Sequence, residues 1–210
     1  MKKLIIIGEG GFGKEVACWA KKCKEYNKEW LLEDYIDIGS EDKENSFQIE
    51  EIILSKIDKY IPVSDFVFSI AVQSPKLKLQ IAESCLSKDL TFINLIHPTA
   101  IIGEDVSLGI GCILCPYVAL TLKVKVGNFV VFNLFSYASY DSEIGDGCTI
   151  NPHCGVMIGA KLGKGVFMGS SSIIFPRKSI GDYAFIGAGS VVLNNVKENE
   201  KVFGVPARRI

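Results

Sequence analysis

Gly8, Gly10 and Gly13 form a glycine-rich turn whose residue types and spacing suit phosphate chemistry. The segment reads Gly-Glu-Gly-Gly-Phe-Gly, follows a short apolar run and precedes a helical pattern. Such a turn presents backbone N–H groups and a helix N-terminus to a phosphate. Asp37 ends the next predicted strand, where it could accept a hydrogen bond from a ribose or a uracil-like base. A structural turn without a ligand fits the same spacing, so both interpretations stay open.

The other reactive groups are two histidines and seven cysteines. With only His97 and His153 present, a three-histidine metal site within one chain is excluded, and we expect no metal. Cys112 and Cys115 form a single C-x-x-C motif, but both also occupy regular positions of a six-residue repeat. The repeat accounts for them without a metal or redox role. The odd number of cysteines without scaffold spacing favours reduced thiols.

Length and charge limit the classes of function. A chain of 210 residues has room for one large domain or two modest ones. The formal net charge of −1 gives no electrostatic reason to expect nucleic acid or membrane binding. The sequence lacks a run of about 18 apolar residues, and its first residues are too short and glycine-rich for a signal peptide. We therefore expect a cytoplasmic protein.

A six-residue repeat over residues 96–192 determines where most side chains of the chain lie. Every sixth residue there is apolar, although such residues make up 48% of the chain, so seventeen chance matches have a likelihood of about four in a million. An even period suits short strands separated by regular corners, and not an α-helix. The pattern predicts a parallel β-helix whose coils bury the apolar column against one another. The column consists of Ile96, Ile102, Leu108, Leu114, Leu120, Val126, Phe132, Ala138, Ile144, Ile150, Val156, Leu162, Met168, Ile174, Ile180, Ile186 and Val192.

Two other columns of the repeat are ordered. The fifth position is small or β-branched in most hexads, and all four prolines of the repeat stand at the third position. The second position is often glycine, which we expect to supply backbone freedom at the corners. The glycines are Gly103, Gly109, Gly127, Gly145, Gly163, Gly169, Gly181 and Gly187.

Residues 1–95 show strands alternating with helices instead. This order predicts a small parallel α/β sheet, a Rossmann-like half, as a separate domain before the β-helix domain of residues 96–210, which includes a C-terminal tail. About 90 residues are too few for a full dinucleotide-binding domain. The predicted strands cover residues 4–7, 30–38, 66–72 and 91–96, and the predicted helices cover residues 14–26, 50–60 and 75–86.

Three motifs connect these parts to a family. They are G-E-G-G-F-G-K-E-V at residues 8–16, I-H-P-T-A at residues 96–100, and V-F-G-V-P-A-R at residues 202–208. With the hexads between them, the chain resembles the acetyltransferases of bacterial surface-sugar biosynthesis, which include bacillosamine N-acetyltransferases and sialic acid O-acetyltransferases. The resemblance implies a left-handed β-helix with three hexads per turn and a homotrimer. It also implies acetyl-CoA in the cleft between neighbouring β-helices and a nucleotide sugar on the N-terminal domain.

The resemblance also implies site residues. Sugar-nucleotide contacts fall on Gly10, Gly11, Phe12, Asp37, Ile38 and Gln73, with Asn133 near the acceptor. Acetyl-CoA contacts fall on Thr149, Ser170 and Ala188, largely through backbone groups near Gly187. The basic tail with Arg208 suits the CoA phosphates, because guanidinium pairs well with phosphate, although a solvated chain end fits it equally.

The sequence departs from the family at the catalytic position. The family carries a histidine followed by Asp or Glu, and this chain has Tyr140 and Asp141 there. A tyrosine, with an ordinary pKa of about 10, is a poor base at neutral pH. The second family histidine is Thr149, a customary Asp is Ile38, and a common Gly is Gln73.

Several accounts of this departure remain open. An amine acceptor needs no strong base if a fraction is neutral or if Asp141 takes the proton late. His153 could be the base instead, although its position two hexads on predicts a different side of the prism. Tyr140 could hydrogen-bond the acceptor or pack against a neighbouring chain.

The sequence therefore predicts an acetyl-CoA-dependent acetyltransferase that acts on the amino group of a nucleotide-linked amino sugar in surface-glycan synthesis. The alternatives are a sugar O-acetyltransferase and a silent ligand-binding or assembly subunit. Chemistry with a nicotinamide cofactor at the glycine-rich turn is a third.

Overall fold

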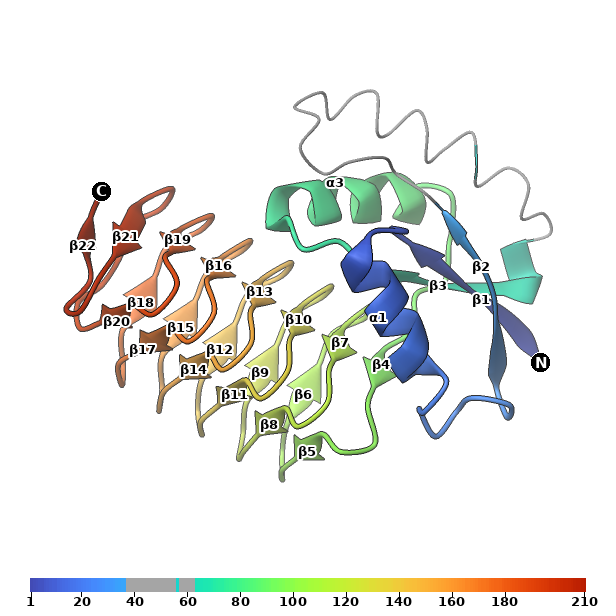
Figure 1. Cartoon of the computed structure of the whole chain (residues 1–210), viewed down its shortest axis with the longest axis horizontal. Coiled ribbons are helices and arrows are strands. Elements are labelled where there is room, and N and C mark those ends of the chain that lie inside the picture. Colours follow the sequence, from blue (N-terminus) through green and yellow to red (C-terminus); the bar gives the residue numbers. More distant parts are fainter. Residues whose placement is uncertain (37–55, 57–62) are drawn as a thin grey trace.

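The structure, a computed structural model, describes residues 1–36, 56 and 63–210. Of the predicted strand 30–38, residues 30–36 are therefore described and residues 37–38 are not. Of the predicted helix 50–60, only residue 56 is described. An α/β domain stands at one end, and a long stack of short strands extends from it to the C-terminus (Figure 1). The predicted fold class, an α/β domain followed by a left-handed parallel β-helix, is confirmed.

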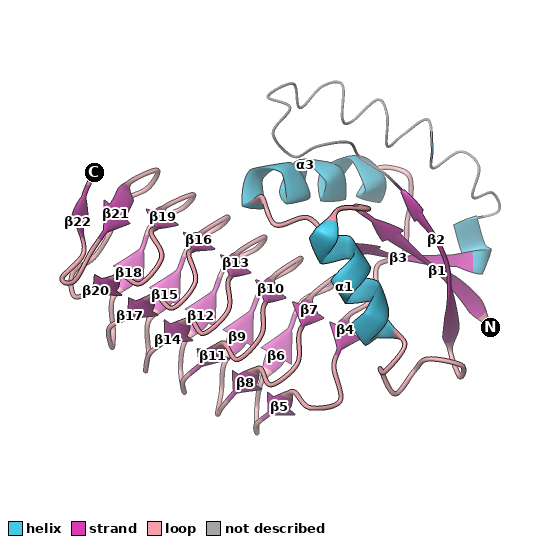
Figure 2. Ribbon diagram, viewed as in Figure 1, coloured by secondary structure: helices cyan, strands magenta, loops and turns pink. Residues whose placement is uncertain are grey.

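The α/β domain contains a parallel sheet of β1 (Lys2–Ile7), β2 (Trp30–Ile36) and β3 (Phe66–Ile70), in the order β2-β1-β3 within the described residues. A short 3₁₀ turn, η1 (Val63–Asp65), leads into β3. The apolar run of β1 suits a central strand that is covered on both faces. Its alternate residues pack in two separate clusters, Leu4 with α1 (Gly11–Ala20) and Ile5 with α3 (Pro75–Leu86). Figure 2 shows these two helices beside the sheet.

The two helices match their predictions unequally. The α3 helix has the predicted bounds, because Ser74 caps it and Pro75 begins it, an arrangement that helix N-termini favour. The helix predicted over residues 14–26 is wrong at both ends, since α1 begins at Gly11 and ends at Ala20. Successive turns follow α1, and Asn27 takes a positive φ of 60°, which ends the helical path before β2.

The β-helix has three sheets, which are parallel apart from the last strand at the C-terminus, and from residue 95 to residue 192 neighbouring strands of one sheet lie 18 residues apart in sequence. The first sheet holds β4 (Leu95–Ile96), β7 (Ile113–Leu114), β10 (Val131–Phe132), β13 (Thr149–Ile150), β16 (Phe167–Met168), β19 (Phe185–Ile186), β21 (Lys201–Phe203) and β22 (Arg208–Arg209). The second sheet holds β5 (Ile101–Ile102), β8 (Ala119–Leu120), β11 (Tyr137–Ala138), β14 (Gly155–Val156), β17 (Ile173–Ile174) and β20 (Val191–Val192). The third sheet holds β6 (Ser107–Leu108), β9 (Lys125–Val126), β12 (Glu143–Ile144), β15 (Lys161–Leu162) and β18 (Ser179–Ile180).

The apolar column of the repeat fills the interior of this prism. From Leu114 to Val192 every member of the column is buried, and Phe132 is completely inaccessible. The first coil is different, because Ile102 stays 41% exposed at the open end of the stack. The predicted inward column therefore holds for all coils that have neighbours on both sides.

The explanation expected for the glycine column is wrong. The second-position glycines do not have a positive φ; instead, all fourth positions from Asp105 to Gly189 do, with φ between 54° and 69°. Ten of those fifteen residues are not glycine. The second-position glycines are needed for space, since a Cβ on Gly145 would lie 2.6 Å from the backbone carbon of Gly163 in the next coil. Close stacking of the coils, and not corner geometry, selects glycine there.

The C-terminal strand closes the stack. β21 runs parallel to β19, whereas β22 pairs antiparallel with β21 through Val202 and Arg209. No helix in the described ranges is both long and apolar enough to span a bilayer.

Candidate functional site

The glycine-rich turn divides into structural and open positions. Gly8 has a φ of 112°, and a Cβ on Gly13 would collide with the carbonyl oxygen of Gly8. By contrast, a Cβ on Gly10 or Gly11 would meet nothing within 4 Å. The N-terminus of α1 begins there, with no side-chain cap and no acidic residue in its first turn. Its N–H groups are thus exposed to an incoming anion, as the motif predicts.

The neighbouring predicted contacts have different surroundings. Asp37 and Ile38 lie outside the described residues. Phe12 is half-buried, with its ring edge-on to Trp19 at 6.4 Å between centroids, so its side chain packs within the domain. Gln73 follows β3, two residues after Ala71, whose N–H donates to the carbonyl of Ile7 at the start of the glycine-rich turn.

Thr149 does not fit the expected contact with acetyl-CoA. It is completely buried at the joint between the two domains. Its hydroxyl donates to the carbonyl of Gln73 at 2.7 Å and accepts from the Lys78 ammonium at 2.9 Å. This arrangement brings two predicted site residues together, but it removes Thr149 from any ligand in this conformation. Lys78 was not predicted as a site residue, although it lies on the same buried stripe of α3 as Ile81, Ala82 and Cys85.

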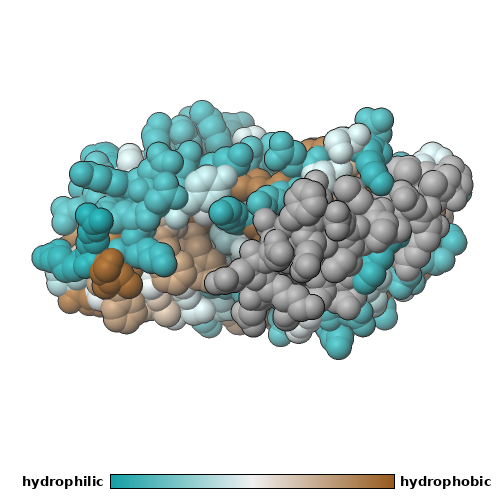
Figure 3. Space-filling view, turned by 90° about the horizontal axis from the view of Figure 1, so that it is seen from above, coloured by the Kyte–Doolittle hydropathy of each residue, from teal (hydrophilic) through white to brown (hydrophobic). Residues whose placement is uncertain are grey.

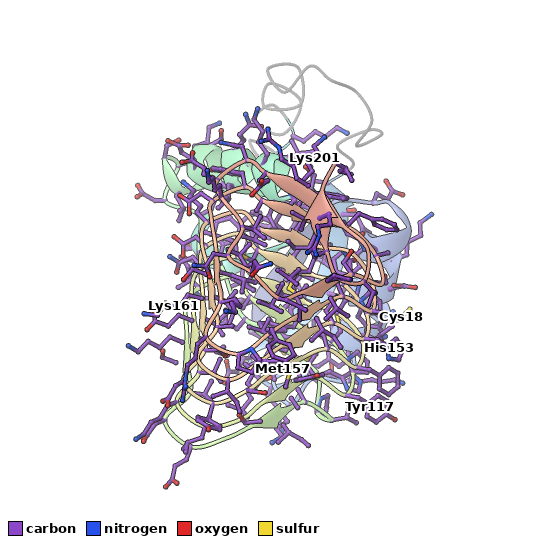
Figure 4. The ribbon with its side chains drawn as sticks, turned by 90° about the vertical axis from the view of Figure 1, so that its left-hand side faces the viewer. Cys18, Tyr117, His153, Met157, Lys161 and Lys201 are labelled. Atoms are coloured by element: carbon purple, nitrogen blue, oxygen red, sulfur yellow. The ribbon has the colours of Figure 1, made fainter. Side chains whose placement is uncertain are left out.

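The turns between the sheets form three edges of the prism. We name two of them by their fourth-position residues. The His153 edge follows the first sheet and consists of Thr99, Tyr117, Phe135, His153, Ser171 and Gly189. The Asp141 edge follows the second sheet and consists of Asp105, Lys123, Asp141, Gly159 and Arg177. Viewed along the prism, His153 and Tyr117 lie on one side and Lys161 lies on the opposite side (Figure 4).

Most of the predicted coenzyme residues lie along the His153 edge. Ser170 and Ala188 are exposed third-position residues in consecutive coils, and the Gly189 N–H donates to the Ser170 carbonyl. Gly187 is buried beneath the ring of Phe203, which leaves no space for a Cβ at this position. Asn133 is also buried on this edge, where its amide oxygen accepts from the Leu134 N–H. Its side chain therefore shapes a turn.

His153 stands on this edge in an aromatic stack. Its ring lies 5.1 Å from Phe135 with planes 5° apart, and Phe135 lies 4.9 Å from Tyr117 with planes 7° apart. His153 lies one coil before Ser170 along the chain, and the stack fixes the plane of its imidazole ring. His153 therefore lies on a different edge of the prism from Tyr140, as its position two hexads further along the sequence predicts.

Tyr140 and Asp141 are exposed on the Asp141 edge. Asp141 has a φ of 58°, and its N–H donates to the Leu122 carbonyl. Among the described residues, neither side chain has a hydrogen bond or ion pair. Both polar ends are therefore available to a ligand, but one chain keeps them a full prism side away from Ser170 and Ala188.

A groove of about 1420 Å³ is lined by residues of α3 and of the later coils of the β-helix. Gln73 and Lys76 border it on one side, and Phe167 and Phe185 on the other, with Lys201 at the end. The two phenylalanine rings stack at 5.0 Å with planes 3° apart. The two residues are 18 positions apart in the sequence, which is one full coil, and this spacing predicts that they stack. From above, the described surface is mainly hydrophilic and is broken by hydrophobic patches (Figure 3).

The outer faces of the second and third sheets differ in polarity. The third sheet presents a charge ladder in which Glu143 lies 3.3 Å from Lys161 and 3.8 Å from Lys125. The outward column of the second sheet has no charged residue and consists of Ile101, Ala119, Tyr137, Gly155, Ile173 and Val191. Gly155 leaves room for the ring of Tyr137, whose Oη would be 2.5 Å from a Cβ at that position.

Six of the seven cysteines and His97 are buried and belong to the packing, whereas Cys18 is exposed. All seven cysteines are free thiols, and burial raises the pKa of Cys112 to about 11 and that of Cys148 to about 12. Burial, with the nearby charge of Lys22, lowers the pKa of His97, whose Nδ1 lies 2.8 Å from the Thr99 hydroxyl. Within the described ranges, no group of three or more His, Cys, Asp or Glu side chains is placed to hold a metal.

Comparison with known proteins relates this geometry to enzymes. Residues 3–85 match the model of the PglD N-terminal domain. Over 189 residues, the chain is 27% identical to a GDP-perosamine N-acetyltransferase of Escherichia coli O157:H7, covering 88% of this chain and 82% of that protein.

Two solved structures share the fold over the whole chain. One is the acetyltransferase domain of PglB from Neisseria gonorrhoeae in complex with acetyl coenzyme A, with a TM-score of 0.83, 22% identity and coverage of 100% of this chain and 99% of that one. The other is a histidine-to-asparagine mutant of perosamine N-acetyltransferase from Caulobacter crescentus in complex with CoA and GDP-perosamine. Its TM-score is 0.85 at 21% identity, with coverage of 100% of this chain and 97% of that one. Residues 3–85 thus match the PglD N-terminal domain, and 88% of the chain is homologous to a GDP-perosamine N-acetyltransferase.

Proposed function

We propose that this chain transfers the acetyl group of acetyl-CoA to the amino group of a nucleotide-linked amino sugar. The proposal rests on the combination of two features in one chain. The first is the uncapped N-terminus of α1 behind the glycine-rich turn, and the second is the exposed edge of the β-helix at Ser170 and Ala188. The relatives with this pair of domains are named for acetyl transfer to perosamine or contain CoA and GDP-perosamine. Surface-glycan synthesis is the proposed use of the product.

The acceptor half of the site is the N-terminus of α1. Backbone N–H groups near Gly10 and Gly11 can receive the phosphates of a nucleotide sugar, since helix N-termini favour anions. The open space above both glycines lets a ligand approach the backbone closely. We place the sugar end of the ligand beyond Gln73, toward the β-helix.

The donor half of the site is the His153 edge. The exposed residues Ser170 and Ala188 leave an accessible edge for the amide-rich arm of CoA, and the exposed Arg208 suits its phosphates. In the reaction, the amine nitrogen attacks the thioester carbonyl, a C–N bond forms, the C–S bond breaks, and the amine loses a proton. Asp141 accepts that proton in our proposal, and the Tyr140 hydroxyl hydrogen-bonds the acceptor.

These donor and acid–base groups meet only if two chains associate. A cyclic assembly joins two different patches of neighbouring chains. The uncharged second sheet lies between the His153 edge and the Asp141 edge, so a copy packed there brings one chain's His153 edge near the next chain's Asp141 edge. We therefore propose a homotrimer with shared sites.

Replacing Ile173 with aspartate should disrupt this assembly. Ile173 is half-buried on the second sheet in the lone chain, and a charge in an apolar interface costs several kcal/mol. We expect sedimentation to show lighter species and lower activity for Ile173→Asp. Ser179→Asp on the charged third sheet is the matched control and should remain trimeric. Equal sedimentation of both variants and the wild type would exclude the second sheet as the interface.

The proposed function is tested by a direct assay. The protein is mixed with acetyl-CoA and a panel of nucleotide-linked amino sugars, and thiol release and acetylated product are measured. We expect product with at least one amino sugar, whereas acetylation of a hydroxyl-only analogue would point to the O-acetyltransferase.

Tyr140, at the usual histidine position, specifically favours a second candidate, the silent binding subunit. The histidine-to-asparagine mutant of the Caulobacter crescentus relative still holds both ligands in its structure. Tight nucleotide-sugar binding without any acetylated product would therefore support the silent subunit. Since acetyl-CoA and nucleotide sugars are soluble cytoplasmic metabolites, we propose a cytoplasmic location for either function.

A further inference from the structure

Lys78 is a completely buried lysine in the joint between the two domains. It lies on α3, and its ammonium donates to the Cys148 carbonyl at 3.2 Å and to the Thr149 hydroxyl at 2.9 Å. Burying an ammonium group is costly unless hydrogen bonds satisfy it. A methionine of similar length would fill the same space without that cost, so packing alone does not account for a lysine here.

The Thr149 hydroxyl extends this contact to the acceptor half of the proposed site. It donates to the carbonyl of Gln73 at 2.7 Å while it accepts from Lys78. Gln73 follows β3 at the edge of the sheet where β1 leads into the glycine-rich turn. Ligands of parallel α/β sheets bind at this carboxyl edge. One hydroxyl thus connects the ligand edge of the sheet to a coil of the β-helix.

Apolar contacts surround this polar connection. Phe92 meets Phe129 edge-on at 5.0 Å, and the side chain of Leu79 packs against Gly147, where any Cβ would collide with it. Such contacts stabilise the joint, but they are not directional. Hydrogen bonds constrain both distance and angle, so the polar connection adds a directional constraint that the apolar contacts lack.

From this geometry we infer that Lys78 and Thr149 are a positioning pair for acetyl transfer. The pair fixes the acceptor edge at Gln73 relative to the β-helix edge that carries the donor. The inference rests on the proposed function and assigns neither residue a contact with the reacting atoms. Misplacing reactants by about 1 Å can cost about a hundredfold in rate, because the reacting atoms must be held in attack geometry.

The test uses Lys78→Met and Thr149→Val, which keep side-chain size and remove the hydrogen bonds. We expect each folded variant to lose at least about tenfold in kcat, with both KM values within about twofold of the wild type. The double variant should lose no more than either single variant, because the residues act as one unit. Lys78→Arg should recover part of kcat.

Phe92→Leu is the structural control. It weakens the same joint by apolar packing, so it should lower thermal stability and leave kcat within about twofold. An unchanged kcat in Lys78→Met, or an equal loss of kcat in Phe92→Leu, would overturn the positioning role.

A second measurement does not depend on activity. Cys18 is the exposed cysteine of the chain, so it can carry one spin label, and Ser179→Cys can carry another on the β-helix. With excess unlabelled protein, the distance between labels within one chain should be narrowly distributed in the wild type and broader in Lys78→Met. An equally narrow distribution in both overturns the inference. If the wild type transfers no acetyl group yet the distribution broadens, the proposed function fails, whereas the role of the pair in orienting the two domains stands.

Discussion

Asp141→Asn is expected to lower kcat by about a hundredfold, since general-base assistance contributes at least that factor. Asparagine has the same shape but cannot accept a proton from the attacking amine. The backbone should not change, because Asp141 has a φ of 58° and asparagine tolerates this left-handed conformation well. Steady-state kinetics across a pH series would measure the loss.

Asp105→Asn is the matched control for this substitution. Asp105 lies two coils away on the same edge, is equally exposed and has a φ of 56°. We expect its variant to keep wild-type kinetics. If Asp141→Asn has unchanged activity at every pH, the carboxylate has no part in proton removal, and a different base must be sought. His153→Gln would then be the next variant.

Gly13→Ala is expected to destabilise the α/β domain by about 3 kcal/mol, the upper range for overpacking. The added Cβ would collide with the Gly8 carbonyl and lie 2.9 Å from its carbon, so α1 must move away from β1. Both tryptophans, Trp19 and Trp30, belong to this domain, so their fluorescence during urea unfolding reports its stability. We expect a lower urea midpoint by fluorescence, with circular dichroism of the β-helix retained.

Gly11→Ala is the opposite case in the same turn. Its Cβ meets nothing within 4 Å, and alanine favours the helix over glycine by up to about 1 kcal/mol. The urea midpoint should therefore rise or stay equal. The KM for the nucleotide sugar should increase, because the methyl group occupies the space through which a phosphate approaches. Equal KM values for Gly11→Ala and the wild type would move the phosphates away from this turn.

The sequence predicted the β-helix well because its repeat is local and redundant. One register of six residues placed Phe132 and every later member of the apolar column inside the prism. The reason for the second-position glycines was predicted wrongly, because a column of glycines in the sequence does not show whether space or a positive φ requires them. At Gly145 the limiting factor is the next coil, 18 residues away.

The candidate site was less predictable because its contacts join distant segments. Thr149 was expected at a ligand, yet it is buried against Gln73, which is 76 residues away. Lys78 was not singled out, since lysine on a helix is usually solvent-exposed. Its place on the apolar stripe of α3 was the available signal. The exposed positions, such as Ser170 and Asp141, were placed on their edges by the repeat alone.

The reversed strand at the C-terminus has a consequence for how these molecules can aggregate. A stack of parallel strands has two unlike ends, and a fibre would grow by docking one end on the other. β22 runs antiparallel to β21 and occupies part of one end, so an incoming first coil cannot continue the parallel pairing there. β22 therefore opposes head-to-tail continuation of the first sheet, while Ile101 and Ile102 stay exposed at the other end of the stack.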